Sequence, residues 1–126
     1  MDIINDTDHT ISHTLVDIDG DPIDTSTFSG IIAKVFQKGI EIDKFSFNTQ
    51  TGFGDIVKVA PTASGVVEFY LNAEKLRQGV NGHEVFYEIK TEIANANFEN
   101  DTEESSTGAI SLGKLIKTKL TNETFN

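Results

Sequence analysis

The 126-residue sequence contains no cysteine, no tryptophan and only two prolines. Without cysteine the chain has no disulfides, no thiol nucleophile and no cysteine-ligated zinc. Only two tyrosines are present, which disfavours a sugar-stacking site, because polysaccharide-binding modules usually rely on exposed indole or phenol rings. These absences favour a chain that folds in a cytoplasm.

Basic residues are also scarce. Ten lysines and arginines stand against 20 aspartates and glutamates, giving a formal net charge of -10. Such a chain would be repelled by the phosphates of nucleic acid and by an anionic membrane surface. No apolar run approaches the ~20 residues of a membrane-spanning helix, and the N-terminus lacks the pattern of a secretory signal. We expect neither nucleic acid nor a membrane as partner.

What the sequence does contain is alternation of apolar and polar residues, which is the period of a half-buried strand. The alternating runs are 10–18, 30–39, 41–49, 55–61, 65–72, 83–94, 108–112 and 114–120. Only residues 72–78 are typical of a helix, of two turns at most. The pattern predicts an all-β fold, an antiparallel immunoglobulin-like β-sandwich of about seven strands with one short helical connection.

The length fits a single domain. We assign it to residues 1–121, with 122–126 as a frayed C-terminal tail. Residues 94–109 are polar and acidic, and this composition predicts a long surface loop.

The stretch LVDIDGDPID is the most acidic turn-like segment, and it raises the question of calcium. Its four carboxylates are Asp17, Asp19, Asp21 and Asp24. A calcium loop of the EF-hand type would need glycine at its sixth position and glutamate at its twelfth, where this chain has Pro22 and Phe28. Asp19-Gly20 between two strand-like runs is instead a strong hairpin signal. A solvated turn is the preferred interpretation. The alternative is a bound calcium ion, because clustered carboxylates repel one another and a cation would relieve that repulsion.

Catalytic patterns are missing. The sequence has no G-x-S-x-G elbow, no HExxH and no phosphate-cradling glycine loop. His9 and His13 lie on a strand pattern, where four residues span ~13 Å, so one metal cannot join them. We expect no catalytic residues, no cofactor and no enzyme activity, and the alternative is a hydrolase acting on surface polysaccharide.

Two phenylalanines lie outside the strand patterns. Phe53 sits between Gly52 and Gly54, and Phe98 sits in the acidic insertion. A large apolar side chain on a polar loop is either folded back onto the domain or buried by another molecule. Both phenylalanines, together with Gly52 and Gly54, are candidate partner-binding residues.

The C-terminal run KLIKTKL gathers three basic side chains in an acidic protein: Lys114, Lys117 and Lys119. They are candidates to pair with Asp101, Glu103 and Glu104 of the same or a neighbouring copy. The alternative is that they protect an edge strand from aggregation.

The order of segments resembles a known family. It runs from SHTLVDIDGDPIDTSTFSGIIAKVFQKG through a hairpin to GVVEFYLNAEKLRQGVNGHEVFYEIKTEI, and covers most of residues 12–93. This resembles the immunoglobulin-like domains of bacteriophage structural proteins, and most nearly the N-terminal domain of the baseplate upper protein family. The matched features are the turn at Asp19, Gly20 and Pro22, the strand Val67 to Leu71, the helical connection Glu74 to Gln78, Gly79, and Phe86 with Tyr87.

This resemblance implies a non-enzymatic structural component of a phage particle, located in the virion and assembled in the host cytoplasm. Its partners would be other capsid, tail or baseplate proteins, with the chain oligomeric in the particle as a capsid decoration (auxiliary) protein or a tail or baseplate protein. The matched positions are structural, so no functional residue is carried over. The rival hypothesis is a carbohydrate- or receptor-binding module, assisted by calcium at Asp17, Asp19, Asp21 and Asp24.

Overall fold

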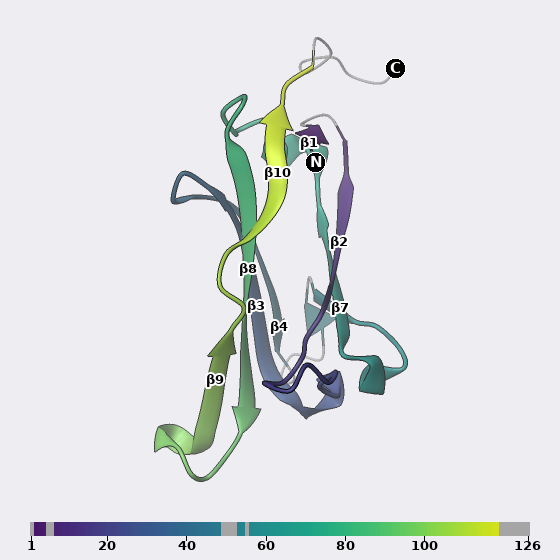
Figure 1. Cartoon of the computed structure of the whole chain (residues 1–126), viewed down its shortest axis with the longest axis vertical. Coiled ribbons are helices and arrows are strands. Elements are labelled where there is room, and N and C mark those ends of the chain that lie inside the picture. Colours follow the sequence, from purple (N-terminus) through teal and green to yellow (C-terminus); the bar gives the residue numbers. More distant parts are fainter. Residues whose placement is uncertain (1, 5–6, 49–52, 55, 119–126) are drawn as a thin grey trace.

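The computed structural model describes residues 2–4, 7–48, 53–54 and 56–118, which form two packed sheets (Figure 1). The strands are β1 (Asp2–Ile4), β2 (His9–Thr14), β3 (Phe28–Gln37), β4 (Ile40–Asn48), β5 (Phe53–Gly54), β6 (Ile56–Lys58), β7 (Val66–Leu71), β8 (Glu84–Ala94), β9 (Thr102–Ser106) and β10 (Ile110–Ile116). The helical elements are α1 (Ala73–Leu76) and the 3-10 turns η1 (Thr25–Thr27), η2 (Thr62–Ser64) and η3 (Glu99–Asp101). None of these helices is long and apolar enough to cross a membrane, within the described ranges.

The strand order confirms the immunoglobulin-like sandwich. The larger sheet runs β1-β10-β8-β3-β4-β5, with β9 also paired to β8, and the smaller sheet runs β2-β7-β6. In immunoglobulin terms β2, β7 and β6 are strands B, E and D, while β10, β8, β3 and β4 are G, F, C and C′. Neighbouring strands are antiparallel except for β1 and β10, which are parallel.

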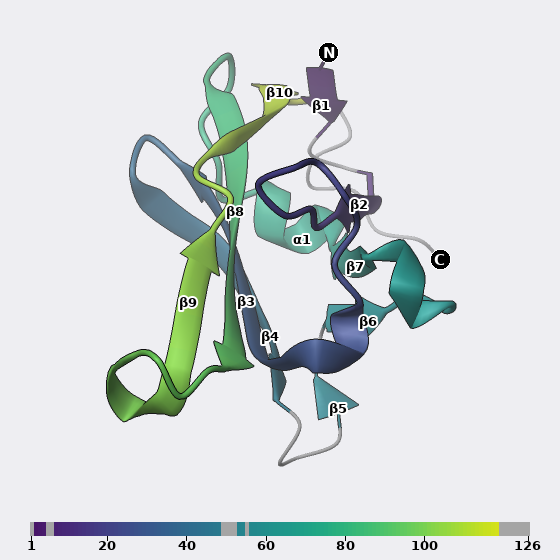
Figure 2. The same cartoon turned by 60° about the horizontal axis from the view of Figure 1, so that its bottom comes forward.

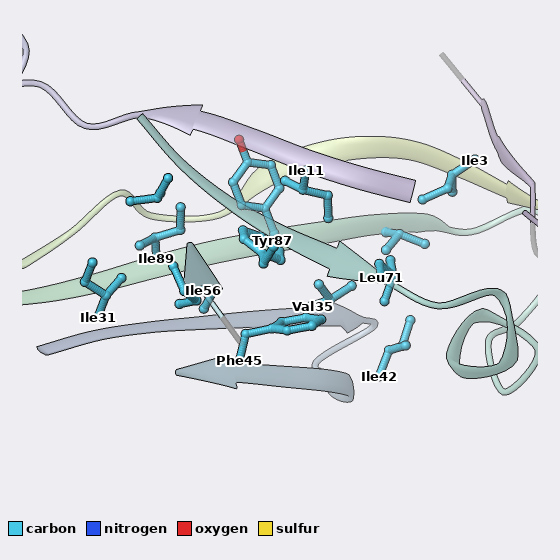
Figure 3. Packing of buried hydrophobic residues seen from close by; sticks show 14 of the residues in the cluster. Ile3, Ile11, Ile31, Val35, Ile42, Phe45, Ile56, Leu71, Tyr87 and Ile89 are labelled. Atoms are coloured by element: carbon cyan, nitrogen blue, oxygen red, sulfur yellow. The ribbon is translucent and has the colours of Figure 1, made fainter. Parts of the chain in front are cut away.

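Alternation decides which side chains form the core. On β3 the residues Ile31, Ala33 and Val35 are fully buried. Buried residues from both sheets meet between them (Figure 3). Strand period two also explains why only one of two adjacent aromatics can point inwards. Tyr87 is buried, whereas Phe86 lies on the outer face of the sheet.

Two strand phenylalanines, Phe36 and Phe86, lie outside the core. Phe36 and Phe86 face outwards from neighbouring strands and stack on each other, with ring centroids 5.9 Å apart. This pairing covers much of the apolar surface of both rings, so neither is fully exposed.

The centre of the core is a row of aromatic contacts that crosses from one sheet to the other. Phe69 on β7 contacts Phe45 on β4 at 4.9 Å between ring centroids and Tyr87 on β8 at 5.8 Å. Tyr87 in turn meets His13 on β2, edge to face at 5.8 Å. In Figure 3 the Tyr87 ring lies among the core side chains with its hydroxyl towards β2. These contacts fix how the two sheets face each other.

Two turns depend on unusual backbone conformations. The β3–β4 hairpin turns at Lys38 and Gly39, both with positive φ (53° and 77°), as a two-residue hairpin turn requires. Gly65, with φ of 75°, lies so close to another segment that a Cβ atom there would be 2.8 Å from the carbonyl oxygen of Leu15. Only glycine satisfies both conditions at this position.

The helical connection between β7 and β8 is held by a polar side chain inside the fold. Gln37, at the end of β3, is only 4% exposed. Its Nε2 donates to the carbonyl oxygens of Val80 (2.8 Å) and His83 (3.0 Å), and its Oε1 accepts from the Val80 N–H (2.6 Å). The glutamine thus satisfies both backbone groups of Val80, and it shares the His83 carbonyl with the Leu115 N–H of β10 (3.0 Å).

The predicted surface loop at 94–109 is wrong in its central part. Thr102–Ser106 forms β9, which pairs with β8 from Lys90 to Ala94. The sequence of β9 is typical of a loop because the strand is mostly exposed. Its side chains are not packed in the core, so the alternation of apolar and polar residues that marks a half-buried strand is missing. The two runs predicted at 108–112 and 114–120 are joined in a single strand, β10, which covers Ile110–Ile116 and whose register shifts between Ser111 and Gly113.

Candidate interaction surface

The β8–β9 hairpin extends beyond the rest of the sandwich in Figure 1 and is seen from another side in Figure 2, and Phe98 lies in the connection between its two strands. The Asn95 N–H donates to the Asp101 carbonyl at 2.8 Å, and the Asn95 Oδ1 accepts from the Asn97 N–H at 3.0 Å. The tip is therefore ordered by its own hydrogen bonds. Phe98 is 51% exposed, so this candidate is not folded back onto the domain.

The outer edge of β9 has no strand partner among the described residues, because β9 pairs only with β8. Two backbone hydrogen bonds show which residues of β9 direct their N–H and C=O groups to β8. The Asn95 N–H donates to the Asp101 carbonyl, and the Thr107 N–H donates to the Ile89 carbonyl. By the alternation of an antiparallel ladder, the backbone N–H and C=O groups of Thr102, Glu104 and Ser106 point away from β8. They form an open edge for another strand.

Beside this edge lies a groove between the two sheets, with a volume of about 590 Å³. Its floor is Phe28 on β3 with Ile89 and Thr91 on β8, and one wall runs from Glu103 on β9 to Ile110 on β10. The other wall is the end of β2 and the turn that follows: His13, Leu15, Val16, Asp17, Ile18 and Ile23. The groove is open here because β1, which borders β10, pairs only from Lys114 to Ile116.

The groove is apolar inside and acidic at its rim. Val16 is 50% exposed and Ile18 fully exposed on one wall. Asp17 lies on that wall and Glu103 on the other. On the outer face of β9, Glu104 pairs with Lys90 at 3.3 Å, a solvent-exposed ion pair.

His13 and Tyr87 join the groove to the core. The His13 Nδ1 lies 2.9 Å from the Tyr87 hydroxyl. Burial lowers the pKa of His13 and raises the pKa of Tyr87, because both charged forms lose solvation. Both groups are therefore held neutral, and with the His13 proton on Nε2 the tyrosine donates to Nδ1.

The acidic segment forms a turn that uses its own carboxylates. The Asp17 Oδ1 accepts from the N–H groups of Asp19 (2.9 Å) and Asp21 (3.0 Å), and Gly20 has a φ of 86°. Asp24 accepts from the hydroxyl and N–H of Ser26, and these bonds lower its pKa. Within the described residues, no three His, Cys, Asp or Glu side chains gather closely enough to hold a metal ion.

Lys114 and Lys117 do not meet the acidic hairpin of their own copy. Lys114 pairs with Glu84 at one end of β8, whereas Thr102 pairs with Ala94 at the other. Ten residues of strand separate them, or roughly 33 Å at about 3.3 Å per residue. For Lys114 and Lys117 the predicted pairing within one copy is thus wrong. Contact between Lys114 or Lys117 and a neighbouring copy stays a prediction.

Of the remaining partner-binding candidates, only the backbone of Phe53 and Gly54 belongs to the described part of the chain. Phe53 and Gly54 form β5, which pairs with Phe47 and Asn48 of β4. Gly52 and Lys119 lie outside the described residues, as does the side chain of Phe53.

Comparison with known proteins gives no match: no family model, no curated protein and no solved structure is significantly similar to the chain.

Proposed function

We propose that this protein is a non-enzymatic structural component of a bacteriophage particle that acts through protein–protein interfaces. Its place would be that of a capsid decoration protein or a tail or baseplate protein. The phage assignment rests on the resemblance in segment order between residues 12 and 93. The observation that carries the interface role is the hairpin β8–β9, whose tip presents Phe98 half exposed.

An exposed aromatic on an ordered, projecting hairpin is suited to binding a protein surface. Its ring offers a large apolar area. Because the hairpin tip is already held by backbone hydrogen bonds, binding costs little conformational entropy. A symmetric particle repeats such a contact many times, so a small interface per copy is sufficient.

The test is quantitative peptide mass spectrometry on density-purified phage particles from the source of this gene. A copy number close to that of the major capsid protein indicates head decoration, and a few copies per particle indicate tail or baseplate. Complete absence from the particles contradicts the proposal and favours a binding module.

The hairpin is tested by Phe98→Ala, with Ile40→Ala as the matched control. Both side chains are exposed, at 51% and 72%, but Ile40 lies in a different hairpin. Loss of an anchoring aromatic costs about 2 kcal/mol, roughly thirty-fold in affinity. We expect Phe98→Ala to reduce incorporation into particles and Ile40→Ala to leave it unchanged, with both proteins as stable as wild type. Equal incorporation of the two variants would exclude Phe98 as the contact.

A further inference from the structure

We propose that β9 accepts an extended segment of a partner protein as an added strand, and that this segment alternates apolar with basic side chains. The inference rests on the proposed interface role, but not on the phage assignment. It concerns the open edge of β9 and the groove that lies beside it.

The edge supplies backbone hydrogen bonds. Thr102, Glu104 and Ser106 direct their N–H and C=O groups away from β8, and these residues are half-buried to exposed. An added strand would pair with these groups and extend the larger sheet, as in other cases of β-strand addition.

The groove supplies side-chain selectivity. Glu103 and Ser105 lie opposite Ile93 and Thr91, so they share the inner face of the sheet and line the groove. A strand added at the edge directs every second side chain to that same face. Those side chains would meet the exposed apolar surface of Val16 and Ile18, and burying it favours an apolar residue at each inner position.

Charge identifies the partner and excludes a second copy at this edge. Two copies of β9 paired edge to edge would bring Glu103 and Glu104 of each near those of the other, next to Glu99 and Asp101. Like charges across a strand pair are destabilising. A segment with lysine or arginine at the outer positions instead lies beside Glu104, Glu92 and Glu88, which share the outer face of the sheet.

The first measurement is amide hydrogen exchange of the whole protein with a synthetic probe. The probe is a seven-residue peptide with blocked ends that alternates lysine with isoleucine or valine. One control peptide has serine at each aliphatic position, and a second has glutamate at each lysine position. We expect the lysine–aliphatic peptide to slow exchange at the amides of Glu104 and Ser106 at least tenfold, and the controls to have little effect.

A pair of variants separates strand addition from attraction by charge. Glu104→Gln removes the charge and keeps the N–H, whereas Glu104→Pro removes both. The Glu104 N–H points away from β8, so proline breaks no bond of the β8–β9 ladder. We expect Glu104→Pro to bind the probe at least tenfold more weakly than Glu104→Gln, with matching thermal melts.

Three outcomes would overturn the inference: equal binding of the two variants, protection that spares Glu104 and Ser106, or equal binding of the lysine–serine peptide. Because the probe is measured in solution, its failure leaves the particle experiment unaffected. Conversely, absence from particles with normal probe binding would reject only the phage assignment.

Discussion

Replacing Gln37 tests the idea that one buried amide holds the loop between α1 and β8. In Gln37→Leu the volume changes little, but three hydrogen bonds to Val80 and His83 are lost. Each such bond contributes about 1 kcal/mol net. The three bonds together give about 3 kcal/mol, and we expect the variant to lose about that much of its free energy of unfolding.

A loss of this size lowers the melting temperature by roughly 10 °C in a domain of this length. The assay is urea unfolding followed by circular dichroism, with thermal melts in parallel. Gln78→Leu is the matched control, because that side chain is exposed and lies in the same connection. The urea midpoint should fall for Gln37→Leu at an unchanged m-value. A loss below about 0.5 kcal/mol, or an equal loss in the control, would refute the role assigned to the amide.

Three further predictions follow from the groove and the turns. The lowered pKa of His13 means that, below its usual value of 6.5, the unfolded chain takes up a proton that the folded chain does not. The free energy of unfolding should therefore fall as the pH drops below that value, and by less in His13→Gln; parallel pH profiles would contradict this. Gly65→Ala should lose at least about 2 kcal/mol in urea unfolding, from the positive φ and the contact with Leu15; full stability would show that the backbone adjusts. Calcium at millimolar concentration should leave the thermal midpoint unchanged relative to chelator, because the Asp17 Oδ1 already accepts two backbone N–H groups and no three ligating side chains gather among the described residues; a raised midpoint would restore the calcium site.

Much of the fold could be predicted because its central strands alternate clearly. β3, β7 and β8 each bury one face, and this requirement is visible in the sequence. β1 was missed because it has three residues and pairs with β10, which is distant in the sequence. Gly113 divided one strand into two predicted runs, although the register shift beside it lets the strand continue.

The interaction surface was harder to predict, because its parts come from distant segments. Phe98 could be identified as an apolar residue in a polar stretch. The groove could not, since its walls come from β2, β9 and β10 and no local pattern records their proximity. β9 was missed for a related reason: Glu103 and Ser105 face an open groove, so the core imposes no apolar alternation on them.

The parallel pairing of β1 with β10 has a mechanical consequence. Asp2, Ile3 and Ile4 pair with Lys114, Leu115 and Ile116 in parallel register, so the two strands run in the same direction. Figure 1 shows β1 next to β10. If one strand is pulled from its N-terminal side and the other from its C-terminal side, the load runs along the strands in opposite senses. All the hydrogen bonds between them are then sheared together instead of opening one after another. We therefore expect the pairing of the short β1 with β10 to resist tension applied through the two ends of the domain.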